Sequence, residues 1–235
     1  MTARGVRQDP AVTLPWMRAG QAAVERVVAA LSDDALRAPS ALPGWSAAHV
    51  VGHVARNAEA LSRLVAWART GIETPMYAHR EQRAADIETS AERPAEILRA
   101  ELTTTAEALD AALAGLDETT WQAGVRSALG RPIPAAEIPW MRVREVWLHG
   151  VDLGEPVDAL PDGVVDALLD DVTGVLSGRD ACPAALLEPT DRDRTWRLGP
   201  DEPTAPVVRG SVAELVAWIT GRARRADAPA LPDWL

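Results

Sequence analysis

The sequence contains no phenylalanine, no lysine, one tyrosine and a single cysteine, Cys182. One cysteine excludes an internal disulfide framework and a zinc cluster made of cysteines. Because lysine is absent, all 24 basic residues are arginines, and nine tryptophans supply almost all of the aromatic side chains. We interpret this bias, together with the heavy use of alanine, as compositional drift rather than as chemistry.

Positive charge is also scarce. The formal net charge is −10 and the sequence pI is about 4.9. A general nucleic-acid or anionic-membrane binder needs a basic surface, so we expect neither kind of partner. The sequence lacks an apolar run that could span a bilayer, and residues 1–10 lack the apolar core of a signal peptide. We therefore expect a soluble, cytoplasmic protein, and we expect it to be a monomer.

Hydrophobic periodicity predicts helices through most of the first 154 residues. Three long helices are expected at 12–31, 47–69 and 94–116, and a shorter helix is expected at 81–89. We expect a loop at residues 35–44. We expect residues 117–138 to form a long connection, of a kind that is often functional. A fourth long helix is expected at 139–153. Four amphipathic helices with one extended crossover predict a four-helix bundle.

The pattern changes after Gly154-Glu155-Pro156, which we interpret as a domain boundary. One helix is expected at 162–176 and another, capped by Ser211, at 212–220. Between them lie three short strand candidates, at 185–188, 195–198 and 206–210. The fold class is therefore α+β, with a four-helix bundle at 1–154 followed by a small α+β domain at 155–235.

The fourth long helix carries the most informative pattern. Glu145 and His149 are four residues apart and therefore lie on one face, one turn above the other. The helix is apolar nearly all round, so it should be buried, and a buried carboxylate must be paired or bound to a metal. A third ligand can come from His49 or His53 on the second long helix, which would complete a catalytic zinc arrangement. Alternatively, Glu145 pairs with a neighbouring arginine, Arg142 or Arg144, and the histidines are hydrogen-bonded core residues.

Several segments resemble the mycothiol-dependent maleylpyruvate isomerase family, whose bundle is of the DinB type. The stretch LPGWSAAHVVGHVARNA at 42–58 resembles the second-helix motif, and REVWLHGVDLG at 144–154 resembles the fourth-helix motif. ETPMY at 73–77, AWITGR at 217–222 and PDWL at 232–235 match further parts of the family. The similarity runs nearly from end to end in the same order.

The resemblance implies a role for particular residues. The family's divalent metal, usually zinc, would be held by His53, Glu145 and His149, and His49 would instead pack near Ser46 at the helix start. The family's functional arginine corresponds to Arg222, with a catalytic and cofactor-binding role. Three more residues match family positions and are assigned to cofactor binding: Tyr77, Arg83 and Asn57. Asp152 would orient a ligand histidine, cap the helix end or pair with an arginine.

The resemblance also implies a reaction, the conversion of maleylpyruvate to fumarylpyruvate with mycothiol as an external thiol. Reversible addition of a thiolate turns the conjugated double bond into a single bond that can rotate, so one hard step becomes two easier ones. A zinc-bound thiol is deprotonated, and Arg222 would bind a carboxylate of the dicarboxylate substrate. Two alternatives stay open: a mycothiol S-transferase acting on other electrophiles, and a non-catalytic metal-binding module.

Overall fold

The computed structural model describes residues 3–232 and 234, and within it the chain forms two compact units. One unit comprises Arg4–Glu155, and the other contains Pro156–Leu235. Asp233 and Leu235 of the closing PDWL segment lie outside the described residues. In the part of the chain that the structure describes, no helix is both long enough and apolar enough to cross a membrane.

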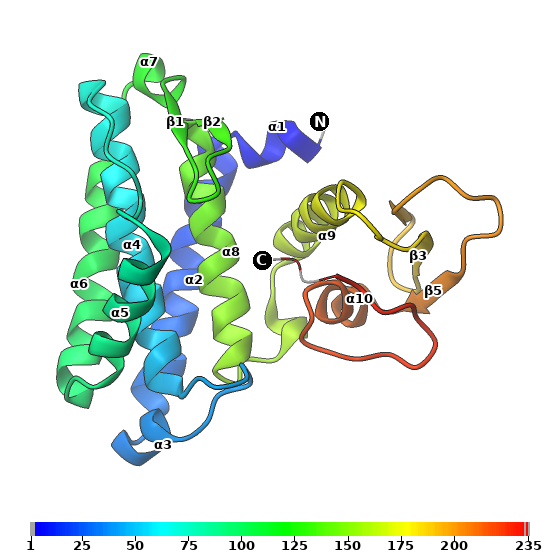
Figure 1. The fold of residues 1–235 in the computed structure, drawn as a ribbon, viewed down its shortest axis with the longest axis horizontal. Helices are drawn as coiled ribbons and strands as arrows, with labels where there is room; N and C mark the ends of the chain where they lie inside the picture. Colours follow the sequence, from blue (N-terminus) through cyan, green and yellow to red (C-terminus); the bar gives the residue numbers. More distant parts are fainter. Residues whose placement is uncertain (1–2, 233, 235) are drawn as a thin grey trace. The chain divides into compact units, whose positions relative to one another are not determined.

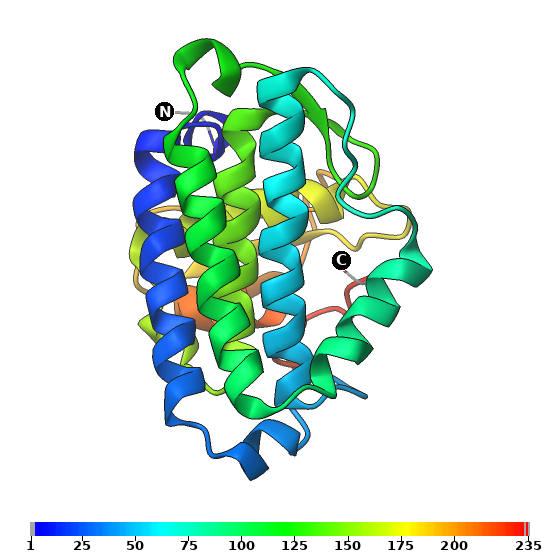
Figure 2. The same ribbon diagram turned by 90° about the vertical axis from the view of Figure 1, so that its left-hand side faces the viewer.

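The first unit is the expected four-helix bundle, with its long helices side by side in both views (Figures 1 and 2). The four helices are α2 (Pro10–Ala30), α4 (Ala47–Thr70), α6 (Ala95–Ala114) and α8 (Ile138–Asp152). Helix α4 packs against both α6 and α8, and α2 packs against α8. The shorter helix α5 (Arg80–Ala91) lies against α4 and confirms the helix expected at 81–89.

Local signals set the ends of these helices. The Ser46 side chain accepts a hydrogen bond from the backbone N–H of His49 and caps α4. Gly71 ends the same helix with φ of +72°, a left-handed conformation that glycine adopts without steric cost. At Gly20 on α2 the reason for glycine is packing instead. A Cβ there would lie 2.5 Å from Val146 Cγ2, so the absent side chain allows α2 and α8 to approach closely.

Two connections that we expected to be irregular contain secondary structure. Residues 33–37 form helix α3 (Asp33–Arg37), because the Ser32 side chain caps a new helix there. The connection expected at 117–138 contains helix α7 (Glu118–Trp121), a two-stranded hairpin of β1 (Gly124–Arg126) and β2 (Pro132–Pro134), and the 3₁₀ turn η1 (Ala135–Glu137). Helix α1 (Ala3–Arg7) was also not predicted. All of these elements are five residues or shorter, too short for periodicity to reveal.

The second unit combines helices with a three-stranded sheet, as expected. It contains η2 (Val157–Ala159), α9 (Asp162–Ser177), β3 (Ala185–Pro189), β4 (Trp196–Leu198), β5 (Val207–Gly210) and α10 (Val212–Ile219). The strand order is β4-β3-β5, with β3 antiparallel to β4 and parallel to β5. Ser211 caps α10 through a reciprocal pair of hydrogen bonds with Glu214.

Candidate metal centre

Three side chains from two packed helices converge inside the bundle. His53 comes from α4, and Glu145 and His149 come from α8, one turn apart. One ligand atom from each residue lies within 4.8 Å of the others, a grouping that could hold a metal ion. His53 Nε2 is 2.9 Å and His149 Nε2 is 3.3 Å from the same carboxylate oxygen, Glu145 Oε2. Two imidazole nitrogens and one carboxylate oxygen are the ligand types that zinc prefers, so the residues fit the expected metal.

The centre is well shielded from water. The exposed side-chain fractions are 4% for His53, 19% for Glu145 and 13% for His149. The His53 ring also meets the Trp45 ring edge-on, with the centroids 5.5 Å apart. Low exposure strengthens electrostatic interactions within the centre, because little solvent screens them.

Asp152 orients one of the two imidazoles. Its carboxylate oxygen accepts a hydrogen bond from His149 Nδ1 at 2.8 Å, and the Asp152 side chain is fully buried. This bond directs His149 Nε2 toward Glu145 and toward the space that the three side chains share. A carboxylate behind a ligand histidine is a common support of metal centres. This hydrogen bond supports the first of the roles that we considered for Asp152, the orientation of a ligand histidine.

Burial and hydrogen bonds set the charges of the three groups. Burial would raise the pKa of Glu145, but hydrogen bonds from His149 and His53 hold that pKa well below its usual range. Burial lowers the pKa of His53 and outweighs the attraction of Glu145. Burial also opposes charge on His149, but Asp152 and Glu145 together raise its pKa. Glu145 is therefore an anion at neutral pH, as a metal ligand must be.

His49 lies outside this centre. Its Nδ1 accepts a hydrogen bond from the Ser46 backbone N–H at 3.1 Å, which completes a capping box at the start of α4. Its Nε2 lies 3.1 Å from Glu88 on α5. The expected packing of His49 near Ser46 is therefore confirmed.

Two of the residues that we assigned to cofactor binding lie next to the centre. Arg83 Nη2 is 3.3 Å from His53 Nδ1. The Arg83 guanidinium also lies 5.8 Å from the centroid of the Tyr77 ring. Burial raises the pKa of Tyr77, and the negative charge of Glu145 adds to the effect, so the phenol stays neutral. Arg83 and Tyr77 thus form one wall beside His53.

The third residue, Asn57, accepts a hydrogen bond from Arg142, a contact that we did not predict from the sequence. Arg142 is 1% exposed, and its Nη1 donates to Asn57 Oδ1 at 2.9 Å and to the Val54 carbonyl at 2.6 Å. Its Nη2 donates to Gln21 Oε1 at 2.9 Å. Burial lowers the pKa of Arg142 to about 10, so it remains a cation at neutral pH. An arginine within an otherwise apolar helix was the sequence signal for this contact.

The contacts of Arg142 also bear on the alternative explanation of Glu145. We considered a pair between Glu145 and either Arg142 or Arg144. Arg142 donates instead to oxygens of α2 and α4, and both imidazoles lie against the Glu145 carboxylate. The carboxylate therefore faces the ligand set expected for a metal centre.

Arg222 belongs to the second unit. It follows Gly221, whose φ is +78°, just beyond the end of α10, and its Nη1 donates to the Thr220 carbonyl at 2.8 Å. Its relation to the metal centre stays a prediction. Cys182 is buried in the same unit, where burial raises the pKa of its thiol.

Comparisons with known proteins agree with this architecture. Residues 17–154 match the family model described as the mycothiol maleylpyruvate isomerase N-terminal domain. A crystal structure described as the mycothiol-dependent maleylpyruvate isomerase is 31% identical to this chain, with a TM-score of 0.90. The match covers 94% of this chain and 95% of that chain. The structure of a histidine-to-alanine mutant of that enzyme matches with the same identity and coverage and a TM-score of 0.89.

Among curated proteins, no significant match to the sequence was found. The family model nevertheless spans both helices that carry His53, Glu145 and His149, and the structural match extends over both units. The chain belongs to the mycothiol maleylpyruvate isomerase family.

Proposed function

We propose that this chain catalyses the cis–trans isomerisation of maleylpyruvate to fumarylpyruvate, with mycothiol as an external thiol. Family membership and the full-length structural match support the choice of reaction. The observation that carries the proposal is the convergence of His53, Glu145 and His149 at one shielded point.

We assign these three residues as ligands of a divalent metal, with zinc as the expected ion. Three protein ligands would leave a position open, as in catalytic zinc sites. When bound, the metal supplies positive charge that ionises a coordinated thiol at neutral pH. The protein's own contribution is to hold His149 through Asp152, to keep Glu145 ionised and to limit the access of water around His53.

Arg222 is the proposed partner of a substrate carboxylate. Its guanidinium is planar and permanently charged, and it matches the geometry of a carboxylate through two parallel hydrogen bonds. Tyr77 and Arg83 are proposed to contact the thiol, because they line the side of the centre next to His53. Asn57 has a supporting place in this proposal, because its amide oxygen already accepts from Arg142.

Turnover of maleylpyruvate by the zinc-loaded protein, with and without mycothiol, tests the proposal. We expect fumarylpyruvate to form only when the thiol is present, with no net consumption of thiol. Consumption of one thiol per substrate would identify an S-transferase, and the absence of any thiol-dependent reaction would favour a metal-binding module. The Arg222→Met variant should raise the KM for maleylpyruvate if this arginine binds a carboxylate.

A further inference from the structure

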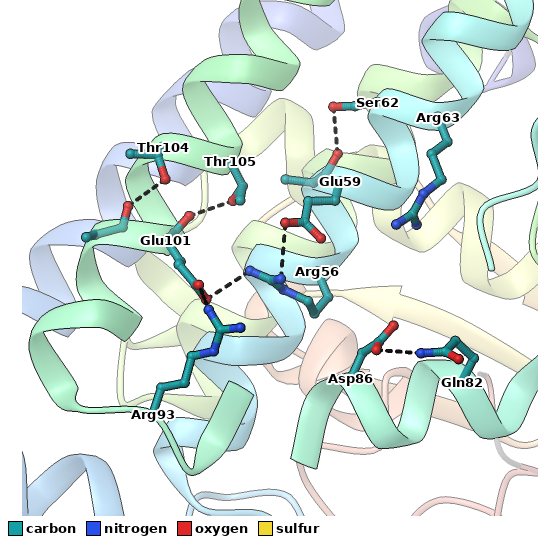
Figure 3. Close-up of polar contacts among 12 residues, drawn as sticks. Arg56, Glu59, Ser62, Arg63, Gln82, Asp86, Arg93, Glu101, Thr104 and Thr105 are labelled. Carbon is teal, nitrogen blue, oxygen red and sulfur yellow. Dashed lines mark hydrogen bonds and ion pairs between the residues drawn. The ribbon is translucent and has the colours of Figure 1, made fainter. Parts of the chain in front are cut away.

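A second feature of the bundle unit is a polar cavity of about 510 Å³ on the other side of Tyr77. Sites for small molecules commonly have volumes of this order, about 300–1,000 Å³. The cavity lies between α4, α5 and the segment that joins them. Figure 3 shows five of its polar side chains, from α4 and α5, around this region. They are Arg56, Glu59, Arg63, Gln82 and Asp86.

The charges that line the cavity balance one another. Arg56 and Arg63 bring two guanidinium groups, and Glu59 and Asp86 bring two carboxylates. Arg56 lies 3.1 Å from Glu59 and also donates to Glu101 at 2.9 Å, so its charge is already compensated. The carboxylates of Glu59 and Asp86 would repel a dicarboxylate ligand in this cavity. A neutral ligand with many hydroxyl groups can donate to the carboxylates and accept from the guanidiniums.

Gln82 and Arg63 are the remaining polar residues from α4 and α5 that line the cavity. Gln82 Nε2 donates to Asp86 Oδ1 at 2.7 Å, which leaves the amide oxygen of Gln82 as an acceptor. Arg63 Nη1 donates to the Met76 carbonyl at 2.7 Å, which anchors the segment that carries Tyr77. The cavity therefore carries both donors and acceptors instead of a patch of one sign.

Two side chains lie between the cavity and the metal centre. Tyr77 lines the cavity, its ring lies 5.8 Å from the Arg83 guanidinium, and Arg83 is 3.3 Å from His53. The cavity and the metal centre are therefore adjacent within the bundle unit, with Tyr77 and Arg83 between them. Mycothiol carries its cysteine on a glucosaminyl-inositol group, which is neutral and rich in hydroxyls.

We propose that the cavity between α4 and α5 binds the neutral, hydroxyl-rich glycoside portion of the thiol, so that its sulfur lies at the metal centre. This inference rests on the proposed function, because it extends the site of the same thiol. It assigns Glu59, Gln82 and Asp86 as hydrogen-bonding partners of the sugar hydroxyls.

The structure offers a matched pair of variants. Ala78 is exposed and lines the cavity, so Ala78→Trp fills the space without removing a polar contact. Ala84 is also exposed, but it lies two positions from Gln82, which places it about 200° around α5 and away from the cavity. Ala84→Trp is therefore the control. Gln82→Ala is a second test variant that removes a hydrogen-bonding group instead of adding bulk.

The first measurement is calorimetric binding of thiol-free N-acetylglucosaminyl-inositol to the zinc-loaded proteins, which does not depend on turnover. We expect Gln82→Ala to weaken binding about tenfold, which corresponds to the loss of one or two hydrogen bonds. Ala78→Trp should weaken binding at least as much, because the indole occupies the space of the ligand. Ala84→Trp should bind like the wild type. No binding by the wild type, or equal loss in both tryptophan variants, would show that the proposal is wrong.

The second measurement separates this proposal from the proposed function. In the isomerase assay, Ala78→Trp should raise the KM for mycothiol and leave the KM for N-acetylcysteine unchanged. Turnover with an unchanged KM for mycothiol would reject the cavity and leave the function intact. Loss of glycoside binding in Ala78→Trp, without isomerase turnover by any variant, would support the cavity and reject the function.

Discussion

Glu145 is the residue on which the metal centre depends. Imidazoles from two helices lie within 3.3 Å of one oxygen of its carboxylate, and their hydrogen bonds keep the carboxylate ionised. A buried anion without such partners would be costly, so the two histidines and Glu145 require one another.

We predict that the protein binds about one zinc ion per chain through this three-ligand set. Glu145→Gln and His149→Ala should each lose most of the metal, because two ligands rarely retain zinc. The measurement is metal analysis by mass spectrometry after dialysis. His79→Asn is the control, because His79 is an exposed helix cap and asparagine also caps helices well. Unchanged zinc in the Glu145 and His149 variants would eliminate this site.

Arg142 supports the centre from one turn earlier on α8. It binds the carbonyl of Val54, the residue next to His53, and so ties the two ligand-bearing helices together. Replacement by methionine removes the donor to the buried amide oxygen of Asn57, at about 1–3 kcal/mol. We expect Arg142→Met to lower both the free energy of unfolding and the affinity for zinc.

Denaturant titration and competition with a zinc chelator measure these two effects of Arg142→Met. Arg18→Met is the control, because the Arg18–Asp110 pair is half exposed and such pairs contribute about 0–1 kcal/mol. A further variant, Arg142→Lys, tests whether Arg142 positions the zinc ligands, because lysine should recover part of the zinc affinity that methionine loses. Wild-type zinc affinity in the Arg142→Met protein would contradict the proposal that Arg142 supports the metal centre.

At the level of elements, the hairpin and the 3₁₀ turn before α8 are joined by a buried carboxylate. Glu137 in η1 accepts hydrogen bonds from Arg131 and, at 3.1 Å, from Gln8. Burial would raise the pKa of Glu137, but these hydrogen bonds outweigh it and the pKa is lowered. The ionised group therefore stabilises the folded state above the ordinary pKa of 4.5, and this contribution is lost as the pH falls through the lowered value.

We predict that Glu137→Gln lowers the free energy of unfolding at pH 7 by about 1–3 kcal/mol, the usual effect of losing a buried charged hydrogen bond. The difference from the wild type should shrink as the pH falls from 4.5 through the lowered pKa of the folded state, because the folded carboxylate becomes protonated over that range. Urea titrations at several pH values measure this difference. A constant difference from pH 7 to pH 3 would show that Glu137 does not act through its charge.

The longest elements were also the most predictable. The four bundle helices, α9 and α10 agree with the sequence patterns because each presents a sustained apolar face. Helix α5 also agrees with its expected range, and the three short strands of the second unit were recognised from apolar residues between turn residues. Helices α1, α3 and α7 and the hairpin were missed. In the hairpin one residue of each strand, Val125 and Ile133, is buried, and their pairing across the turn is a contact that no local pattern contains.

For the whole molecule, the origin of the reacting thiol can be tested with Cys182. This residue belongs to the second unit, and burial raises the pKa of its thiol, so it is protonated and a weak nucleophile at neutral pH. We predict that Cys182→Ser retains wild-type turnover with added mycothiol, within about twofold, as expected of a small change outside the reacting groups. Loss of turnover in a folded, zinc-containing Cys182→Ser protein would contradict an external thiol.

The sequence by itself determined the helices of the bundle, the small α+β unit and the pairing of Glu145 with His149, because a four-residue spacing on a helix defines one face. It also placed His49 and His53 on a second helix, and the choice of His53 came from family resemblance. Only the tertiary structure decided which histidine meets Glu145, how Arg142 joins α4 to α8, and where a polar cavity adjoins Tyr77. Those contacts join residues as many as 92 positions apart, and their distances follow from helix packing rather than from any local pattern.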